Sequence, residues 1–194
     1  MIEEFVLPRG SNEICVTSYG KSATGVLLCP PHPMYGGSRQ DSRLVAIAEE
    51  LAESGICALC LDYSVYTGGT EEIKDTLFIL EHMSKTMTST GLLGYSYGAV
   101  VASNAAAQFQ NLKGLVLVSP LRKINGMEIA LSSTCKKLII YGSCDALVTE
   151  DIDEIYDLSK GDKQRLGLDT DHFYCGYERD VARAVVEFFH EALR

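Results

Sequence analysis

A serine flanked by two glycines is the feature of this sequence that most directly suggests chemistry. Gly94, Ser96 and Gly98 form a Gly-x-Ser-x-Gly pattern, with an apolar run before it and small residues after it. The run predicts a buried strand and the small residues predict a helix, so Ser96 is expected on the tight turn between them. Glycines let the backbone turn sharply there and let the helix and strand approach closely. Ser96 could act as a nucleophile if a base, an acid and an oxyanion-binding site lie nearby.

The base is expected to be a histidine, because it must take the serine proton near neutral pH and return it to the leaving group. Of the four histidines, His82 and His190 fall in predicted helices, and His32 lies in a Pro-Pro-His-Pro loop. His172 follows the last predicted strand and precedes the last predicted helix. Functional groups of open α/β sheets collect at the carboxyl ends of strands. We therefore predict that His172 is the base, the alternative being an ordinary histidine on a surface loop.

The acid must hold the other imidazole nitrogen and is also expected on a loop after a strand. Asp145 follows the strand predicted over 137–141, and the order Ser96, Asp145, His172 is that of a known catalytic triad. Asp171 adjoins His172, but neighbours in sequence seldom face each other. We predict that Asp145 is the acid, with a turn-forming or capping role as the alternative. Further along the chain, three acids have the pattern of solvated helix charges: Asp151, Asp153 and Asp157.

An oxyanion hole needs two backbone N–H donors aimed at the developing negative charge. One is expected from Tyr97, the residue after the serine. The other should come from the loop over 30–38, where Pro33 has no N–H, so that Met34 or Tyr35 must donate. We favour Met34. The alternative is a Pro- and Gly-rich turn without a catalytic role.

Alternating apolar and amphipathic segments predict an α/β sheet covered by helices on both faces. The later strands are almost continuously apolar, as expected where both faces are buried, whereas the first two alternate and suit an antiparallel edge. Strands are predicted over 3–7, 13–18, 25–30, 56–61, 89–94, 114–119, 137–141 and 164–168. Helices are predicted over 41–54, 71–85, 97–108, 151–158 and 178–193.

The composition is that of an ordinary globular protein, with 46% hydrophobic and 22% charged residues. A chain of 194 residues is most simply one domain spanning 1–194. The net charge of −9 argues against nucleic acid or an anionic membrane as a partner. We find no signal-peptide pattern and no apolar run long enough to span a membrane, so we expect a cytoplasmic protein.

Seven cysteines are spread along the chain without the spacing of a disulfide framework. Cys57 and Cys60 match C-x-x-C, but they lie in a predicted strand and would point to opposite faces. Cys144 and Cys175 flank the acid and base segments, where a metal site is conceivable in principle. We predict core packing for the first pair and no metal site for the second.

Taken together, the motifs Pro31–Gly37, Gly94–Gly98, Gly142–Asp145 and Asp171-His172 resemble those of the α/β-hydrolase superfamily. Within it the chain is similar to the small dienelactone-hydrolase-like and esterase-like branch over nearly its whole length. The resemblance implies a mostly parallel eight-stranded sheet with helices on both faces. Only 17 residues, Pro120 to Lys136, lie between the strand predicted over 114–119 and the strand predicted over 137–141, which precedes Asp145. We therefore expect no lid domain between them. Dienelactone hydrolases use a cysteine nucleophile, whereas this chain carries Ser96.

The predicted activity is that of a serine hydrolase acting on a small-molecule ester or related acyl substrate, without a cofactor. Tyr35 and Tyr95 are expected to help bind the substrate, although half-buried packing roles are equally compatible with their positions. An open, lidless site favours short acyl groups. The alternatives are a thioesterase, peptidase or acyltransferase with the same triad, or a noncatalytic binding module of the same fold. The oligomeric state is left open.

Overall fold

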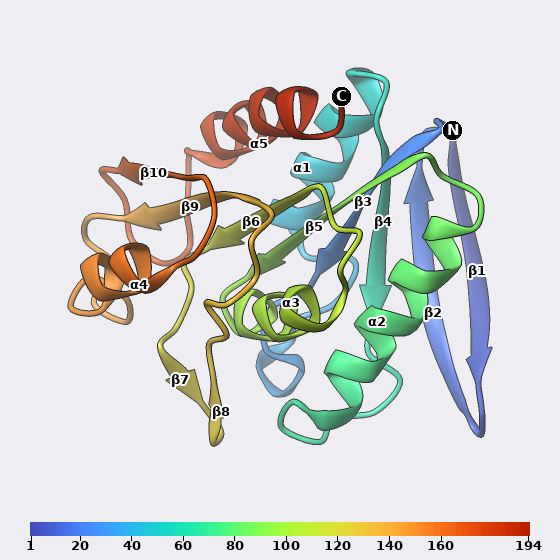
Figure 1. The fold of residues 1–194 in the computed structure, drawn as a ribbon, viewed down its shortest axis with the longest axis horizontal. Helices are drawn as coiled ribbons and strands as arrows, with labels where there is room; N and C mark the ends of the chain where they lie inside the picture. Colours follow the sequence, from blue (N-terminus) through green and yellow to red (C-terminus); the bar gives the residue numbers. More distant parts are fainter.

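The centre of the molecule is a twisted eight-stranded sheet, seen in Figure 1 in a computed structural model that describes residues 1–194. Its strand order is β1-β2-β4-β3-β5-β6-β9-β10. The pairs β1–β2 and β2–β4 are antiparallel and all other pairs are parallel, so β2 alone runs against the rest. The strands are β1 (Ile2–Arg9), β2 (Asn12–Tyr19), β3 (Thr24–Cys29), β4 (Cys57–Asp62), β5 (Ser89–Tyr95), β6 (Gly114–Val118), β9 (Lys136–Gly142) and β10 (Lys163–Leu168).

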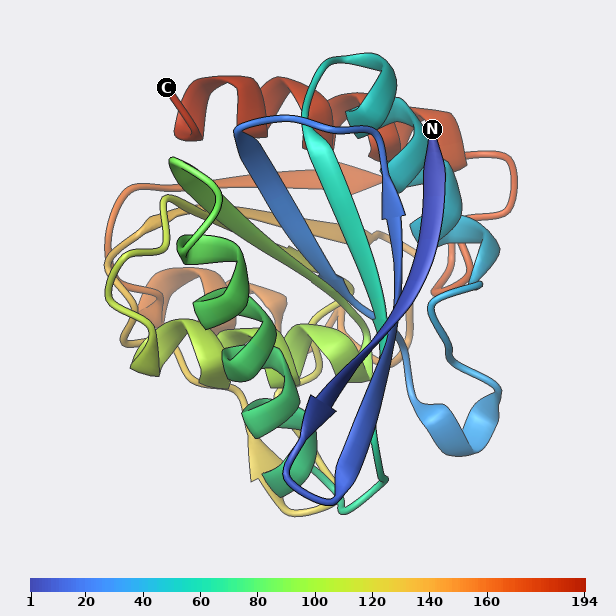
Figure 2. The same cartoon turned by 90° about the vertical axis from the view of Figure 1, so that its right-hand side faces the viewer.

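Five α-helices cover the two faces of this sheet. Helices α1 (Ser42–Glu53) and α5 (Glu178–Ala192) pack on one face, while α2 (Thr70–Ser84), α3 (Tyr97–Gln108) and α4 (Ile152–Leu158) lie on the other (Figure 2). Each face holds an apolar cluster of 23 buried residues, which explains the continuously apolar central strands. No helix is long and apolar enough to cross a lipid bilayer.

The predicted fold class is confirmed, including the antiparallel edge formed by β1 and β2. The segment between β6 and β9 contains the hairpin β7 (Lys123–Ile124) and β8 (Met127–Glu128), for which no strands were predicted. Asn125 and Gly126 form its turn with φ of 51° and 85°. Positive φ at both central residues is the geometry that Asn-Gly favours in a two-residue hairpin. This short hairpin replaces any lid domain.

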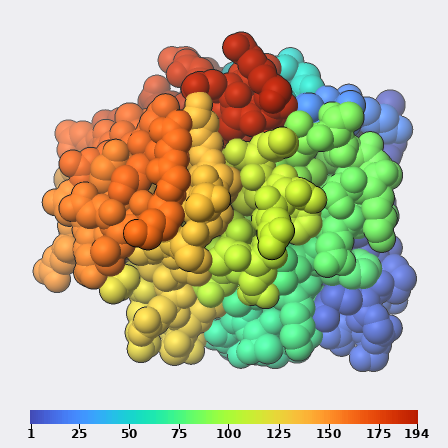
Figure 3. All heavy atoms as spheres, in the orientation of Figure 1, coloured from blue at the N-terminus to red at the C-terminus, as the bar shows by residue number.

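The loops that follow β3, β4 and β6 meet at one end of the molecule. Figures 1 and 2 both place the β7–β8 hairpin at this end, with the short 3₁₀ helix Pro33–Tyr35. Asn125 at the hairpin tip contacts the Tyr66 hydroxyl, with its Nδ2 2.7 Å from the Tyr66 oxygen. Asn125 Nδ2 also lies 2.8 Å from His32 Nε2, so that three loops distant in sequence are joined around the carboxyl ends of the strands. In the space-filling view of Figure 3, the N-terminal hairpin and the α4–β10 region lie at opposite edges of the same face.

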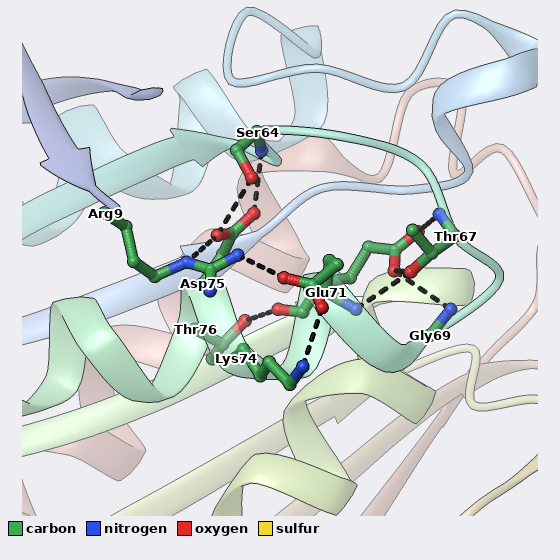
Figure 4. Close-up of polar contacts among 9 residues, drawn as sticks. Arg9, Ser64, Thr67, Gly69, Glu71, Lys74, Asp75 and Thr76 are labelled. Carbon is green, nitrogen blue, oxygen red and sulfur yellow. Dashed lines mark hydrogen bonds and ion pairs between the residues drawn. The ribbon is translucent and has the colours of Figure 1, made fainter. Parts of the chain in front are cut away.

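Buried carboxylates at the start of α2 fix the loop after β4 (Figure 4). Asp75 is fully buried and accepts hydrogen bonds from Arg9 Nε at 2.6 Å and from the Ser64 amide at 2.7 Å. The Arg9 guanidinium also pairs with Glu71 at 2.7 Å. Because Arg9 ends β1 and Ser64 follows β4, one carboxylate ties the sheet edge to a loop at the carboxyl end.

The Cys57 and Cys60 side chains lie on opposite faces of β4, as the strand prediction requires. Cys57 belongs to the apolar cluster beneath α2 and α3, and Cys60 to the cluster beneath α1 and α5. Both thiols are free and buried, and burial raises the pKa of each. They pack as small apolar side chains.

Candidate active site

Ser96 lies on a sharp turn between β5 and α3. Its backbone has φ of 56° and ψ of −115°, a conformation that a non-glycine residue adopts only when its surroundings impose it. A Cβ at position 94 would lie 2.1 Å from the Gly98 carbonyl oxygen, and one at position 98 would lie 2.3 Å from the Cys29 carbonyl oxygen. Both glycines of the motif are therefore required by close backbone packing around the turn.

The structure brings the three predicted triad residues together. His172 Nε2 lies 2.8 Å from Ser96 Oγ, and His172 Nδ1 lies 2.7 Å from Asp145 Oδ2. Asp145 follows β9 and His172 follows β10, two neighbouring parallel strands whose carboxyl ends meet at this edge. Gly142 permits the close approach, because a Cβ there would lie 2.3 Å from the Thr170 carbonyl oxygen. In this arrangement the imidazole can accept the serine proton while the carboxylate holds its other nitrogen.

The Asp145 carboxylate is buried and fully hydrogen-bonded. Besides His172, its Oδ2 accepts from Ser119 Oγ at 2.8 Å, and its Oδ1 accepts from the Leu147 amide at 3.0 Å. Burial alone would raise the pKa of Asp145, but the hydrogen bonds from His172 and Ser119 outweigh it and the pKa is lowered. Ser119 also lies 2.8 Å from the Tyr174 hydroxyl. The carboxylate is thus held ionised and oriented.

The other histidines and aspartates named in the sequence analysis are exposed or bind other partners. His82 and His190 are exposed on helices α2 and α5. Asp171 turns toward its own loop and accepts a hydrogen bond from the Phe173 amide at 2.9 Å. Asp153 on α4 pairs with Arg165. None of these four side chains joins the Ser96–His172–Asp145 chain of hydrogen bonds.

The expectation that Met34 supplies the second oxyanion donor is not supported by the structure. The Met34 amide instead donates to His32 Nδ1 at 3.2 Å, which caps the short 3₁₀ helix, and the Met34 side chain points outward. The Tyr35 amide is likewise engaged, with the His32 carbonyl at 3.0 Å. A donor after Pro33 is the expectation from the sequence, because Pro33 itself has no N–H. The amide without an acceptor is instead that of His32, which precedes Pro33.

The backbone N–H of His32 has no intramolecular acceptor, and His32 lines the same cavity as Ser96. Tyr97 is the first residue of α3, where an N–H has no partner within the helix. These two amides are the candidate oxyanion donors. Burial lowers the pKa of the His32 imidazole, with Glu72 partly opposing it. A neutral ring agrees with Nδ1 accepting the Met34 N–H.

A buried glutamate anchors the Tyr97 side chain beneath the site. Glu72 Oε1 accepts from the Tyr97 hydroxyl at 2.9 Å and from the Thr67 amide at 2.8 Å. Its Oε2 accepts from Thr67 Oγ1 at 2.7 Å and from the Gly69 amide at 3.0 Å. Burial would raise the pKa of Glu72, but these hydrogen bonds outweigh it and the pKa is lowered. The residue that follows Ser96 is therefore tied to the start of α2.

Tyr95 lines the cavity, but its hydroxyl is already engaged. It donates to the backbone carbonyl of His172 and accepts from Arg43 at 2.6 Å. Arg43 is in turn fixed by Asp41, with a 2.9 Å hydrogen bond from Nε. The hydroxyl of Tyr95 therefore links Arg43 to the loop that carries His172. Sequence reasoning assigned Tyr95 to substrate binding and had no pattern that links it to His172.

A cavity of about 290 Å³ opens beside Ser96 and His172. Of the two residues predicted for this loop, Tyr35 lines the cavity and Met34 does not. Most of the remaining lining was not anticipated from the sequence, because it comes from loops without a motif. The lining residues not yet placed there are Pro31, Gly36, Gly37, Asp41, Arg43, Leu121, Ile124, Leu147 and Phe173.

Cys144 and Cys175 are free and exposed. Cys144 Sγ lies 3.6 Å from Asp169 Oδ1, away from the Asp145 carboxylate. No group of three or more His, Cys, Asp or Glu side chains is arranged to hold a metal ion. The ionisable side chains of the site, His172 and Asp145, are instead joined to each other by a hydrogen bond.

No protein-family model and no curated protein matches the sequence. Solved structures do match it. An alpha-beta serine hydrolase homologue from Coxiella burnetii superimposes with a TM-score of 0.83 at 21% identity, covering 96% of each chain. XC6422 from Xanthomonas campestris, an α/β serine hydrolase without a lid, gives 0.79 at 19% identity, over 99% of this chain and 95% of that one.

The esterase Pf2001 from Pyrococcus furiosus gives a TM-score of 0.86 at 18% identity, over 100% of this chain and 94% of that one. At such low sequence identity, similarity over whole chains shows that the backbones follow the same path. Together with the observed strand order, the single reversed strand β2 and the turn at Ser96, it shows that this chain has the α/β-hydrolase fold in a form without a lid.

Proposed function

We propose that the protein is a serine hydrolase that cleaves small carboxylic esters through an acyl-enzyme. The observation that carries the proposal is the continuous chain of hydrogen bonds from Ser96 Oγ through His172 to Asp145, with distances of 2.8 and 2.7 Å. Each group has the partner that its role requires. A serine that serves only a structural role needs neither an imidazole on its hydroxyl nor a buried carboxylate behind that imidazole.

In the first half-reaction, Ser96 Oγ attacks the carbonyl carbon of the ester while His172 Nε2 accepts the serine proton. Asp145 stabilises the imidazolium that forms. The negative charge on the carbonyl oxygen is stabilised by the amides of Tyr97 and His32. His172 then returns the proton to the alcohol oxygen, the C–O bond breaks, and the acyl group remains on Ser96.

In the second half-reaction, water replaces the alcohol. His172 Nε2 accepts a proton from the water as its oxygen attacks the acyl carbon. Collapse of the second tetrahedral intermediate breaks the bond to Ser96 Oγ, which regains the proton from His172. The products are a carboxylic acid and an alcohol.

Structural neighbours support an ester as the substrate class. One of them, Pf2001 from Pyrococcus furiosus, is described as an esterase, and another, Est1E from Butyrivibrio proteoclasticus, was solved with ferulic acid bound. The same triad could serve a thioesterase, a peptidase or an acyltransferase, since these differ in pocket shape rather than in catalytic groups. A noncatalytic binding module is the alternative from another class.

Active-site labelling tests the proposal directly. A fluorophosphonate probe is incubated at about pH 8 with the native protein, with the His172→Ala variant and with heat-denatured protein. We expect stoichiometric labelling of Ser96, identified by peptide mass spectrometry, in the native protein alone. Equal labelling of native and His172→Ala protein, or no labelling of native protein, contradicts the proposed activity.

A panel of nitrophenyl esters, a thioester and an aminoacyl amide then separates the reaction classes. With acetyl as the common acyl group, we expect turnover of the ester to exceed that of the amide by orders of magnitude. A preference for the thioester or the amide would replace the esterase assignment while leaving the roles of the triad intact.

A further inference from the structure

Three exposed apolar side chains surround the mouth of the cavity beside Ser96. Tyr35, Leu147 and Phe173 are 88%, 61% and 60% exposed, and all three line this cavity. They come from three separate loops, after β3, β9 and β10. Large apolar side chains this exposed are common singly, but a set that converges on one opening marks a site of contact.

The interior of the cavity continues this apolar surface. Leu121, just before the β7–β8 hairpin, and Ile124, in β7, form another part of its wall and are partly buried against the core. The apolar residues therefore extend from the rim to the depth of the site. A group that entered the cavity would meet apolar side chains on several sides.

The charged groups of the lining neutralise one another. Asp41 and Arg43 both lie in the wall, and Arg43 binds Asp41 through Nε at 2.9 Å and through Nη2 at 2.5 Å. A further nitrogen of the guanidinium donates to the Tyr95 hydroxyl at 2.6 Å. The Arg43 guanidinium stacks 4.3 Å from the centre of the Tyr95 ring. With its charge paired and its orientation fixed, this arginine is poorly placed to bind an anionic substrate group.

The volume of the cavity sets a size for its occupant. About 290 Å³ corresponds to about ten water molecules at about 30 Å³ each. An acetyl group would leave most of that space filled by water in contact with apolar side chains. A medium-length alkyl chain or an aryl group of eight to ten non-hydrogen atoms, by order of magnitude, would replace that water.

We propose that the natural substrate is an uncharged ester carrying an apolar alkyl or aryl group, which fills this cavity and lies against Tyr35, Leu147 and Phe173. The proposal rests on the proposed esterase function and deepens it by naming the substrate class. It also replaces the expectation that an open site favours short acyl groups. The rim surrounds the reactive serine itself, so a substrate can cover it, whereas a permanently bound partner would block the reaction.

Two series of esters test the proposal. In one, nitrophenyl esters run from acetate through butanoate and octanoate to dodecanoate, and in the other the acyl group is acetyl and the alcohol grows. We expect kcat/KM to rise at least tenfold with size in one of the two series and to level off beyond about ten non-hydrogen atoms. The series that shows the rise identifies the half of the ester that occupies the cavity.

Single substitutions locate the effect on the rim. Leu147→Ser and Tyr35→Ser should each lower the ratio of kcat/KM for the large ester to that for the small one by about tenfold. Leu158→Ser is the matched control, because Leu158 is also an exposed leucine, 49% exposed on α4, and lies outside the cavity lining. That control should leave the ratio unchanged.

The outcomes separate this proposal from the proposed function. If the probe labels Ser96 but kcat/KM is independent of size, or Leu147→Ser leaves the ratio unchanged, the apolar assignment is overturned and the esterase function stands. If Leu147→Ser instead abolishes a dimer seen by light scattering and leaves the ratio intact, the rim is an interface between copies, which also overturns it.

Binding to a Ser96→Ala variant tests the cavity without turnover. By calorimetry, an octanoate ester should bind at least tenfold more tightly than the acetate ester of the same alcohol. Leu147→Ser in the Ser96→Ala background should remove most of that difference. Equal affinity for the two esters contradicts the proposal whether or not the native protein hydrolyses them.

Discussion

Ser119 Oγ donates a hydrogen bond to Asp145 Oδ2 over 2.8 Å, on the same carboxylate oxygen that accepts from His172 Nδ1. Ser119 directly follows β6, which pairs with the β9 strand that leads to Asp145, and it has a positive φ of 44°. Ser119 does not line the cavity beside Ser96, so it positions the carboxylate from outside that cavity.

Ser119→Ala should lower kcat by about three- to tenfold, as expected for the loss of one hydrogen bond to a charged group. The pKa of Asp145 is lowered in the folded protein against the effect of burial, in part by Ser119, so the variant should raise it again. The acid limb of the kcat profile is expected to move to higher pH. Profiles of kcat against pH for the variant and wild type measure this shift.

Ser143→Ala provides the control for that experiment. Ser143 is an exposed serine two residues before Asp145, and its Oγ lies 3.4 Å from Asp169. An unchanged profile in this variant alongside a moved acid limb in Ser119→Ala supports the positioning role. Superimposable profiles for Ser119→Ala and wild type would contradict it.

Asp145→Asn should lower kcat by about 10³- to 10⁴-fold, since an amide group in that place favours the wrong imidazole tautomer. Asp171→Asn should change kcat less than threefold, because Asp171 accepts only from the Phe173 amide. Steady-state kinetics on the same ester compares the two variants. A larger loss in Asp171→Asn than in Asp145→Asn would reverse the assignment of the acid.

Tyr95→Phe removes the hydroxyl that joins Arg43 to the His172 carbonyl while keeping the ring in the cavity wall. We expect kcat to fall about three- to tenfold with KM nearly unchanged, because the loop that carries His172 loses a fixed contact but the substrate surface does not. The rate of fluorophosphonate labelling should fall in parallel.

Tyr156→Phe is the comparison for this substitution, since the Tyr156 hydroxyl donates to the Lys163 carbonyl at 3.3 Å and Tyr156, on α4, lies outside the cavity lining. That variant should retain wild-type kinetics. A rise in KM at constant kcat in Tyr95→Phe would show instead that its hydroxyl binds substrate.

Glu72→Gln should destabilise the protein by about 2 kcal/mol at pH 7, because a buried carboxylate with four hydrogen-bond donors is replaced by an amide that cannot accept all of them. The pKa of Glu72 in the folded protein is lowered from its ordinary value of 4.5. Its contribution is therefore present above that value and is lost as the pH falls through the folded pKa.

Urea unfolding at pH 7 and at successively lower pH measures this effect. The difference in unfolding free energy between wild type and Glu72→Gln should narrow as the medium becomes acidic. Glu81→Gln is the control, since Glu81 is exposed on the same helix. A difference that stays constant with pH would show that ionisation of Glu72 does not stabilise the fold.

Much of the fold could be predicted because its signals are local. Continuous apolar runs predict central strands, amphipathic periods predict helices, and both alternate in an order that allows few topologies. The hairpin between β6 and β9 was missed although Asn125-Gly126 is a turn signal, because its two strands have only two residues each. Strands so short carry no readable alternation.

The sequence by itself determined which residue types could react, through the Gly-x-Ser-x-Gly turn at Ser96 and through loops that must follow strands, where Asp145 and His172 lie. Those positions follow from parallel strands, whose carboxyl ends meet at one edge. Only the tertiary structure decided which amide is free, His32 rather than Met34, because the competing acceptor is the His32 ring itself. It also decided that Ser119 meets Asp145, and that Tyr35, Leu147 and Phe173 surround one cavity. Contacts between side chains from separate loops depend on how the whole chain packs, and no spacing within the sequence encodes them.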